Sequence, residues 1–153
     1  MNIEYKKAKL VDILEMQKLV LPEVESGVIL ERSSDEIATN IRSYTLAYKD
    51  SELVGFCALH IHTFSLAEIR SLIVKENLRG LKIGKTLVNK CLDEAISLEV
   101  KKVLSLTYKQ LFFERLGFFE IPKESIPEHK IWADCIKCKY FPVCNEVSLI
   151  KTL

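Results

Sequence analysis

The first part of the chain alternates apolar and polar positions in a way that predicts a strand followed by a helix. Residues 3–9 alternate side chain by side chain, which is the period of a half-buried strand. Apolar residues then recur at helical spacing over residues 11–21, and Pro22 marks the expected end of this helix. Residues 27–32 predict a connection or a short extended segment.

A second helix and a β-hairpin are predicted next. Ser33 followed by Glu36 is a capping-box pattern, and it predicts a helix that continues to about Tyr44. Residues 45–48 and 53–62 are two strand-like runs separated by a polar turn. Such a pair is typical of antiparallel strands joined by a tight turn.

The centre of the chain predicts a buried strand that leads into a long helix. Residues 69–74 are an apolar run with β-branched side chains, bounded by charged positions. A polar turn containing Arg79 and Gly80 follows, and the helix is expected from about Ile83. Its apolar positions recur at helical spacing: Ile83, Leu87, Cys91, Ala95 and Leu98.

The remaining pattern completes an α+β (mixed α/β) fold. A strand is predicted at 102–107, a short helix at 111–116 that Gly117 ends, a strand at 118–121 and a last strand at 147–151. The resulting order is β-α-α-β-β-β-α-β-α-β-β. This order favours one sheet of mixed strand direction rather than a doubly wound parallel sheet.

Composition narrows the class of protein. Hydrophobic residues make up 48% of the chain, which is enough for a single packed domain over residues 1–153. A net charge of +1 gives no reason to expect nucleic acid or an anionic membrane as a partner. No apolar run approaches the length of about 18 residues that a membrane span needs. The first residues lack the apolar core of a secretory signal, so we expect a cytoplasmic protein.

The turn before the long helix has the chemistry of an anion site. Gly80 and Gly84 allow backbone N–H groups to point into one hollow at the helix N-terminus, where the helix dipole favours negative charge. Arg79, Lys82 and Lys85 add cationic side chains around it. A diphosphate fits such a hollow, although an ordinary helix start with solvated cations would show the same residue types.

These residues resemble the signature of the GNAT superfamily of acetyl-CoA-dependent N-acetyltransferases. The signature is Arg or Gln, any two residues, Gly, any one residue, and then Gly or Ala. Residues 79–84 match it with one exception: Lys82 stands where the signature has its first Gly. The segments LVGFCAL and FFERLGF extend the resemblance over nearly the whole chain. It implies a mostly antiparallel sheet of six to seven strands flanked by about four helices, with acetyl-CoA as cofactor. The implied cofactor-binding residues are Leu72, Ile73, Val74, Arg79, Gly80, Lys82, Ile83, Gly84 and Lys85.

Two further segments are similar to the acetyltransferase domain of N-acetylglutamate synthases, in a short stand-alone form. They are GVILERSSDEI and IPKESIPEHKIW. The resemblance implies acetyl transfer to the α-amino group of L-glutamate, a first step of arginine biosynthesis. It implies that Arg32 binds the α-carboxylate with backbone help from Leu30. The family's contacts to the side-chain carboxylate have no clear match, and Lys130 or Lys151 is a plausible replacement.

The resemblance also assigns the chemical steps. Glu68 matches the position of the general base that accepts the proton of the amine. A backbone N–H near Ser71 is placed to stabilise the oxyanion. Thr107 matches the proposed proton donor to the thiolate, with Tyr108 as a second candidate, because Phe113 stands where many GNAT enzymes have Tyr.

Simpler interpretations of the same residues stay open. Glu68 is also typical of a strand-end carboxylate facing water, Arg32 of a surface cation paired with a nearby acidic side chain, and Thr107 of a packed strand residue. The histidines at 60 and 62 share a strand face and receive no site assignment.

Other functions and ligands also remain. The acceptor is alternatively another amino acid, a polyamine or a protein N-terminus, or the chain is a non-catalytic acetyl-CoA-binding module. A homodimer is possible. Three cysteines and an upstream histidine have a spacing that suits zinc, but free thiols are favoured and no metal is assigned: Cys135, Cys138, Cys144 and His129.

Overall fold

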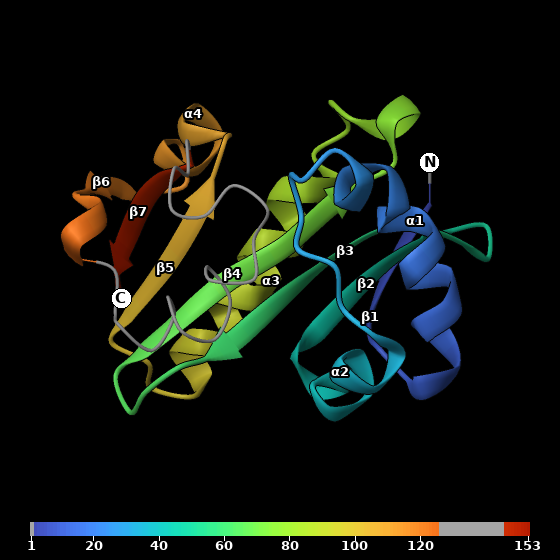
Figure 1. The fold of residues 1–153 in the computed structure, drawn as a ribbon, viewed down its shortest axis with the longest axis horizontal. Coiled ribbons are helices and arrows are strands. Elements are labelled where there is room, and N and C mark those ends of the chain that lie inside the picture. The colour runs from blue at the N-terminus through green and yellow to red at the C-terminus, as the bar shows by residue number, and fades with distance from the viewer. Residues whose placement is uncertain (1, 126–145) are drawn as a thin grey trace.

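The computed structural model describes residues 2–125 and 146–153, which form one seven-stranded sheet with helices on both faces (Figure 1). The strand order is β1-β2-β3-β4-β5-β7-β6. The strands are β1 Ile3–Lys7, β2 Tyr44–Lys49, β3 Glu52–Ile61, β4 Leu66–Val74, β5 Lys102–Thr107, β6 Phe119–Ile121 and β7 Val147–Thr152. The α-helices are α1 Ile13–Glu25, α2 Ser34–Thr39, α3 Ile83–Ser97 and α4 Gln110–Glu114.

The sheet is antiparallel throughout except between β4 and β5, which run parallel. This arrangement confirms the predicted mixed, mostly antiparallel sheet and the predicted order of elements. A parallel pair requires a crossover connection, and α3 provides it. Within the part of the chain that the structure describes, no helix is long and apolar enough to cross a membrane.

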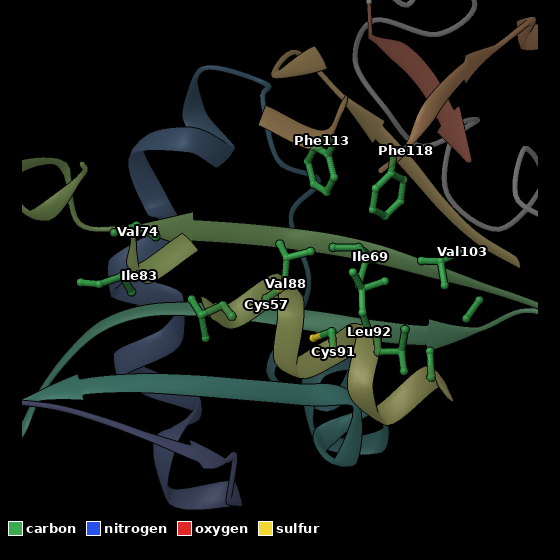
Figure 2. Close-up of a cluster of buried hydrophobic side chains, with 14 of the residues drawn as sticks. Cys57, Ile69, Val74, Ile83, Val88, Cys91, Leu92, Val103, Phe113 and Phe118 are labelled. Carbon is green, nitrogen blue, oxygen red and sulfur yellow. The ribbon is translucent and has the colours of Figure 1, made fainter. Parts of the chain in front are cut away.

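The long helix α3 covers one face of the sheet, and α1 and α2 cover the other (Figure 1). Figure 2 shows the α3 side, where Val88 and Leu92 pack towards Ile69 of β4. Each fully buried aliphatic side chain of this kind stabilises the fold by about 1.5–3 kcal/mol. The core therefore holds β4 rigidly from the side of α3.

Two cysteines belong to this core. Cys57 of β3 and Cys91 of α3 are fully buried. The hydrogen bond to Cys91, followed by burial, holds the pKa of the Cys57 thiol well above its usual range. Because neither side chain is exposed, both cysteines act as small packed side chains in the core.

The first helix is longer than predicted. The expectation that it ends at Pro22 is wrong, because α1 continues to Glu25 with the proline inside it. Proline lacks an N–H donor, but the Pro22 carbonyl still accepts a hydrogen bond from the Ser26 N–H at 3.1 Å. The Glu23 carbonyl accepts two more, from the N–H groups of Val28 and Ile29 at 2.9 and 3.2 Å. The last turn is therefore closed despite the proline.

The second helix begins where predicted and ends earlier. The Ser33 hydroxyl accepts from the Glu36 N–H at 3.1 Å, and the Glu36 carboxylate accepts from the Ser33 N–H at 3.3 Å, which is the predicted capping box. The helix ends at Thr39, however, and Tyr44 already belongs to β2. Tyr44 is buried there against the edge of Phe56, with ring centroids 5.9 Å apart. Packing in the sheet outweighs local helix propensity at this point.

The strand β4 separates from β5 after its first three residues. The two strands pair only from Leu66 to Glu68, and Figure 1 shows them diverging from that end. A bulge follows, because Ser71 adopts a left-handed conformation (φ 59°) and the register with β3 shifts there. Beyond Glu68, the edge of β4 that faces β5 is therefore not covered by that strand.

Candidate active site

A cavity of about 450 Å³ occupies the space between the diverging strands. Its walls come from β4, from the end of β5 and from the segment between α1 and α2. All the residues predicted for catalysis line it, as do most of those predicted for substrate binding: Glu68, Thr107, Tyr108, Leu30, Arg32 and Ser71. Leu72, Ile73 and Arg79 line it as well. The fold thus brings together residues that are far apart in sequence, since Glu23 and Glu146 both line this cavity.

The corner between β4 and α3 has the form expected of an anion site. The helix begins at Ile83, as predicted, and its first hydrogen bond runs from the Thr86 N–H to the Lys82 carbonyl at 3.0 Å. The N-cap residue, Lys82, makes no side-chain hydrogen bond that caps the N-terminus of α3. The first amides of the helix therefore remain available for an anion.

The conformation at this corner explains the glycine of the family signature. Lys82 adopts a left-handed conformation (φ 64°, ψ 16°), which glycine reaches without strain. Gly80 also has a positive φ of 90°. An added Cβ at Gly84 would meet its nearest neighbour, Val74 Cγ2, at 3.6 Å, which is an ordinary contact and agrees with the alanine that the signature allows there.

The cations at this corner divide into two kinds. Lys82 and Lys85 are exposed beside the helix start. The Arg79 guanidinium instead donates from Nε to the Val74 carbonyl at 3.2 Å and lies 3.3 Å from Glu23 Oε1. Arg79 therefore connects the turn to the end of β4 and to α1.

Arg32 projects from the segment between the first two helices. Its side chain is only 12% exposed, and its Nη1 lies 3.8 Å from Glu36 Oε2. A second, mostly apolar cavity of about 250 Å³ lies under α1, and Arg32, Leu30 and Ser71 line both cavities. Arg32 is thus a largely buried cation between two cavities rather than a solvated surface residue.

Glu68 is buried, with 2% of its side chain exposed. The interpretation of Glu68 as a carboxylate facing water is therefore wrong. Its Oε1 lies 2.7 Å from Nε2 of His62, whose side chain is fully buried. His62 received no site assignment from the sequence. The available signal was its position directly after β3, which ends at Ile61, at the start of the turn that leads to β4.

The end of β5 contributes polar groups to the cavity. The Thr107 hydroxyl accepts a hydrogen bond from the Lys109 N–H at 2.8 Å, and Tyr108 is 44% exposed. Lys109, which the sequence analysis did not select, also lines the cavity. Burial, followed by the nearby Arg79 guanidinium, holds the pKa of the Lys109 ammonium below its usual value.

Some predicted residues are not brought to this site. Lys151 does not line the cavity, and its ammonium lies where a side chain on Gly117 would be. Lys130 and the four residues with zinc-like spacing lie outside the described residues. Among the residues that are described, no group of His, Cys, Asp and Glu side chains has the arrangement of a metal site.

Comparisons with known proteins agree with this geometry. Residues 10–118 match the acetyltransferase (GNAT) family. An uncharacterized N-acetyltransferase of Chlorobaculum tepidum is 38% identical over 150 residues, which is 97% of this chain and 95% of that protein. The amino-acid acetyltransferase of Vibrio atlanticus is 24% identical over 129 residues, or 83% of this chain. The chain spans only 29% of the length of that relative.

Two solved structures share the fold. N-acetylglutamate synthase from Neisseria gonorrhoeae, complexed with coenzyme A and N-acetyl-glutamate, has a TM-score of 0.87 and 22% identity. The match covers 100% of this chain and 35% of that one. A Mycobacterium tuberculosis protein in complex with CoA has a TM-score of 0.84 and 22% identity, covering 98% and 99% of the two chains.

The chain belongs to the acetyltransferase (GNAT) family. It is an acetyl-CoA-dependent acetyltransferase. The residues at the corner fit this cofactor, because the uncapped start of α3 and the exposed Lys82 and Lys85 suit a diphosphate.

Proposed function

We propose that this enzyme transfers acetyl from acetyl-CoA to the α-amino group of a small acidic amino acid, with L-glutamate as the first candidate. The observation that carries the proposal is that Arg32 and Glu68 line the same cavity. A guanidinium suits the α-carboxylate of the acceptor, because its planar fork forms two charge-assisted hydrogen bonds. A carboxylate suits the amine, which must lose a proton before it can attack.

The proposed chemistry follows from these positions. Glu68 accepts the proton of the ammonium group, directly or through water. The nitrogen then forms the amide bond to the acetyl carbon while the carbon–sulfur bond breaks. A backbone N–H at the Ser71 bulge is proposed to stabilise the developing oxyanion. The thiolate receives a proton from Thr107 or Tyr108, both of which line the cavity.

The charges of the cavity support an anionic acceptor over a polyamine. Four cationic side chains line it, from Arg32, Arg70, Arg79 and Lys109. Three carboxylates line it, from Glu23, Glu68 and Glu146. A site for a polyamine needs an excess of negative charge, whereas an amino acid with two carboxylates is favoured by an excess of positive charge.

A second acceptor class is favoured by one specific observation. The 250 Å³ cavity beside Arg32 is lined mainly by apolar side chains such as Met16, Val20 and Phe56. An amino acid held by its α-carboxylate at Arg32 has this apolar space within reach. An apolar amino acid such as leucine or methionine is therefore the second candidate.

A steady-state screen of amines with acetyl-CoA tests the proposal. The set contains glutamate, aspartate, glutamine, leucine, methionine and spermidine, and the measured quantity is kcat/KM. Glutamate is expected to give the highest value. A clearly higher value for leucine or methionine moves the assignment to the apolar class. A higher value for spermidine, or tight CoA binding without turnover of any amine, contradicts the proposal.

Arg32→Ala tests the carboxylate contact directly. Loss of the charge-assisted bonds is expected to raise the KM for the amino acid by about 10- to 100-fold and to leave the KM for acetyl-CoA unchanged. Arg42→Ala is the matched control, because Arg42 is exposed and does not line the cavity. An unchanged amino-acid KM in Arg32→Ala removes this residue from the site.

A further inference from the structure

We infer that His62 is a positioning residue that holds the Glu68 carboxylate ionised and directed at the cavity; this inference rests on the proposed role of Glu68 as the base. The two side chains meet at 2.7 Å between His62 Nε2 and Glu68 Oε1. They are 0% and 2% exposed. Glu68 lines the cavity, and His62 is its buried partner.

The hairpin between β3 and β4 fixes the position of His62. The N–H groups of His62 and Thr63 both donate to the Leu66 carbonyl, at 2.9 and 3.1 Å. The Thr63 hydroxyl accepts a hydrogen bond from the Leu66 N–H at 3.1 Å, which stabilises the turn. The His62 ring also packs edge-on against His60, with centroids 4.7 Å apart. The backbone hydrogen bonds of the turn and the contact with the His60 ring thus fix the imidazole in position beside Glu68.

The hydrogen bond has a direct chemical consequence. A buried carboxylate without a donor is driven towards its neutral acid form, and a neutral acid cannot accept a proton. With its Nε2–H donating to Oε1, His62 favours the ionised form of Glu68, which is the form that can accept the proton of the amine. The dyad therefore maintains an ionised base on a side chain that is almost fully buried.

Other titratable groups near Glu68 are retained in a His62 variant. His60 is its cross-strand partner on β3, and Arg70 lies two residues further along β4. Arg32 and Glu146 line the same cavity from other elements. The neighbouring residue of β5 is Leu104, which is apolar. A change in the pH profile of a His62 variant therefore reports the lost hydrogen bond.

The test compares His62→Leu with His62→Gln. Leucine fills space without a donor, whereas glutamine places an N–H close to the position of Nε2. We expect His62→Leu to move the acid limb of the kcat–pH profile upwards by about one unit, because the pKa of Glu68 rises when its donor is lost. At pH values below that limb, kcat of His62→Leu is expected to be about tenfold lower than that of the wild-type enzyme, while the KM for acetyl-CoA is unchanged. His62→Gln is expected to restore most of the wild-type profile.

Glu68→Gln and the double variant Glu68→Gln/His62→Leu separate the two hypotheses. If His62 acts through Glu68, adding His62→Leu to Glu68→Gln changes kcat no further. A wild-type pH profile for Glu68→Gln overturns the base assignment itself. An impaired Glu68→Gln beside a His62→Leu with the wild-type limb overturns only the role of His62. Equal losses at all pH values in His62→Leu and His62→Gln, with lowered melting temperatures, also overturn it. His62→Ala replaces His62→Leu if the leucine variant does not fold.

Discussion

Lys82 occupies a backbone conformation that is unusual for any residue with a side chain. Its φ of 64° lies in the left-handed region, where a Cβ costs about 1–2 kcal/mol. The same turn directs the first amides of α3 towards the corner where the cofactor diphosphate is proposed to bind. The strained residue therefore lies at the proposed diphosphate site, and the Lys82 side chain adds a cation there.

Lys82→Gly separates these two effects. We expect the free energy of unfolding to rise by about 1 kcal/mol, because glycine adopts this conformation without strain. The KM for acetyl-CoA is expected to rise severalfold, because one cation is lost. Urea denaturation and steady-state kinetics measure the two quantities. Lys85→Ala is the control, since it removes a neighbouring exposed cation from within the helix; a Lys82→Gly variant that is no more stable than wild type contradicts the strain argument.

At the residue scale, local signals were predictable and long-range contacts were not. The signature around Gly80 and Gly84 predicts the cofactor site at the corner between β4 and α3 from a few neighbouring positions. The His62–Glu68 contact depends on the length and register of a hairpin turn, and a one-residue change of register would direct Glu68 to the other face. The burial of Arg32 depends in the same way on where a long connection packs.

Among the elements, β4 is held at a fixed distance from β3 by a glycine. A Cβ on Gly55 would lie 2.9 Å from the Ile73 carbonyl oxygen and 3.3 Å from Leu87 Cδ1. The first of these neighbours is backbone, so it cannot move without shifting the strand. Ile73 lines the cavity, and the absence of a side chain at Gly55 therefore determines where one wall of the site lies.

Gly55→Ala is expected to lower the free energy of unfolding by about 1–3 kcal/mol, as overpacking of a core does. It is also expected to raise the KM for acetyl-CoA, because the displaced strand carries proposed cofactor contacts. Thermal denaturation and kinetics on the same sample measure both. Gly84→Ala serves for comparison, since its added Cβ has no neighbour closer than 3.6 Å. Equal stability of the two variants would show that β4 shifts without cost.

The elements themselves were largely predictable from the sequence. The start of α3 and both ends of β5 agree with the pattern, because strong periodicity and clear turns bound these elements. The end of α1 was misplaced, because the helix continues through Pro22 and its last carbonyls accept hydrogen bonds from residues beyond it. The end of α2 was misplaced because Tyr44 is drawn into the sheet.

Across the whole molecule, the proposed sites for acetyl-CoA and for the acceptor are formed by different elements. The proposed acetyl-CoA site is formed by α3 and the end of β4, on the side of the larger core. The proposed acceptor side is formed by the segment between α1 and α2 and by the ends of the diverging strands. The Arg79–Glu23 ion pair, at 3.3 Å, links the two sides directly.

Coenzyme A is expected to stabilise the whole fold. At a concentration about 100 times its dissociation constant, a ligand that binds only the folded state adds about 2.7 kcal/mol. For a domain of this size, the melting temperature should rise by about 5–10 °C. Differential scanning fluorimetry measures the shift. Pantetheine, which lacks the diphosphate, is the control and is expected to give a much smaller shift at the same concentration; equal shifts would contradict a diphosphate site at α3.

The separation of β4 from β5 near the start of β4 also bears on how the acceptor specificity of this enzyme can evolve. The strand edge that it uncovers consists of main-chain amides and carbonyls, which no single side-chain replacement removes. The acceptor, by contrast, is proposed to be recognised by side chains on a connecting segment. Exchange of a few residues there should redirect the enzyme to a new amine while its use of the thioester persists.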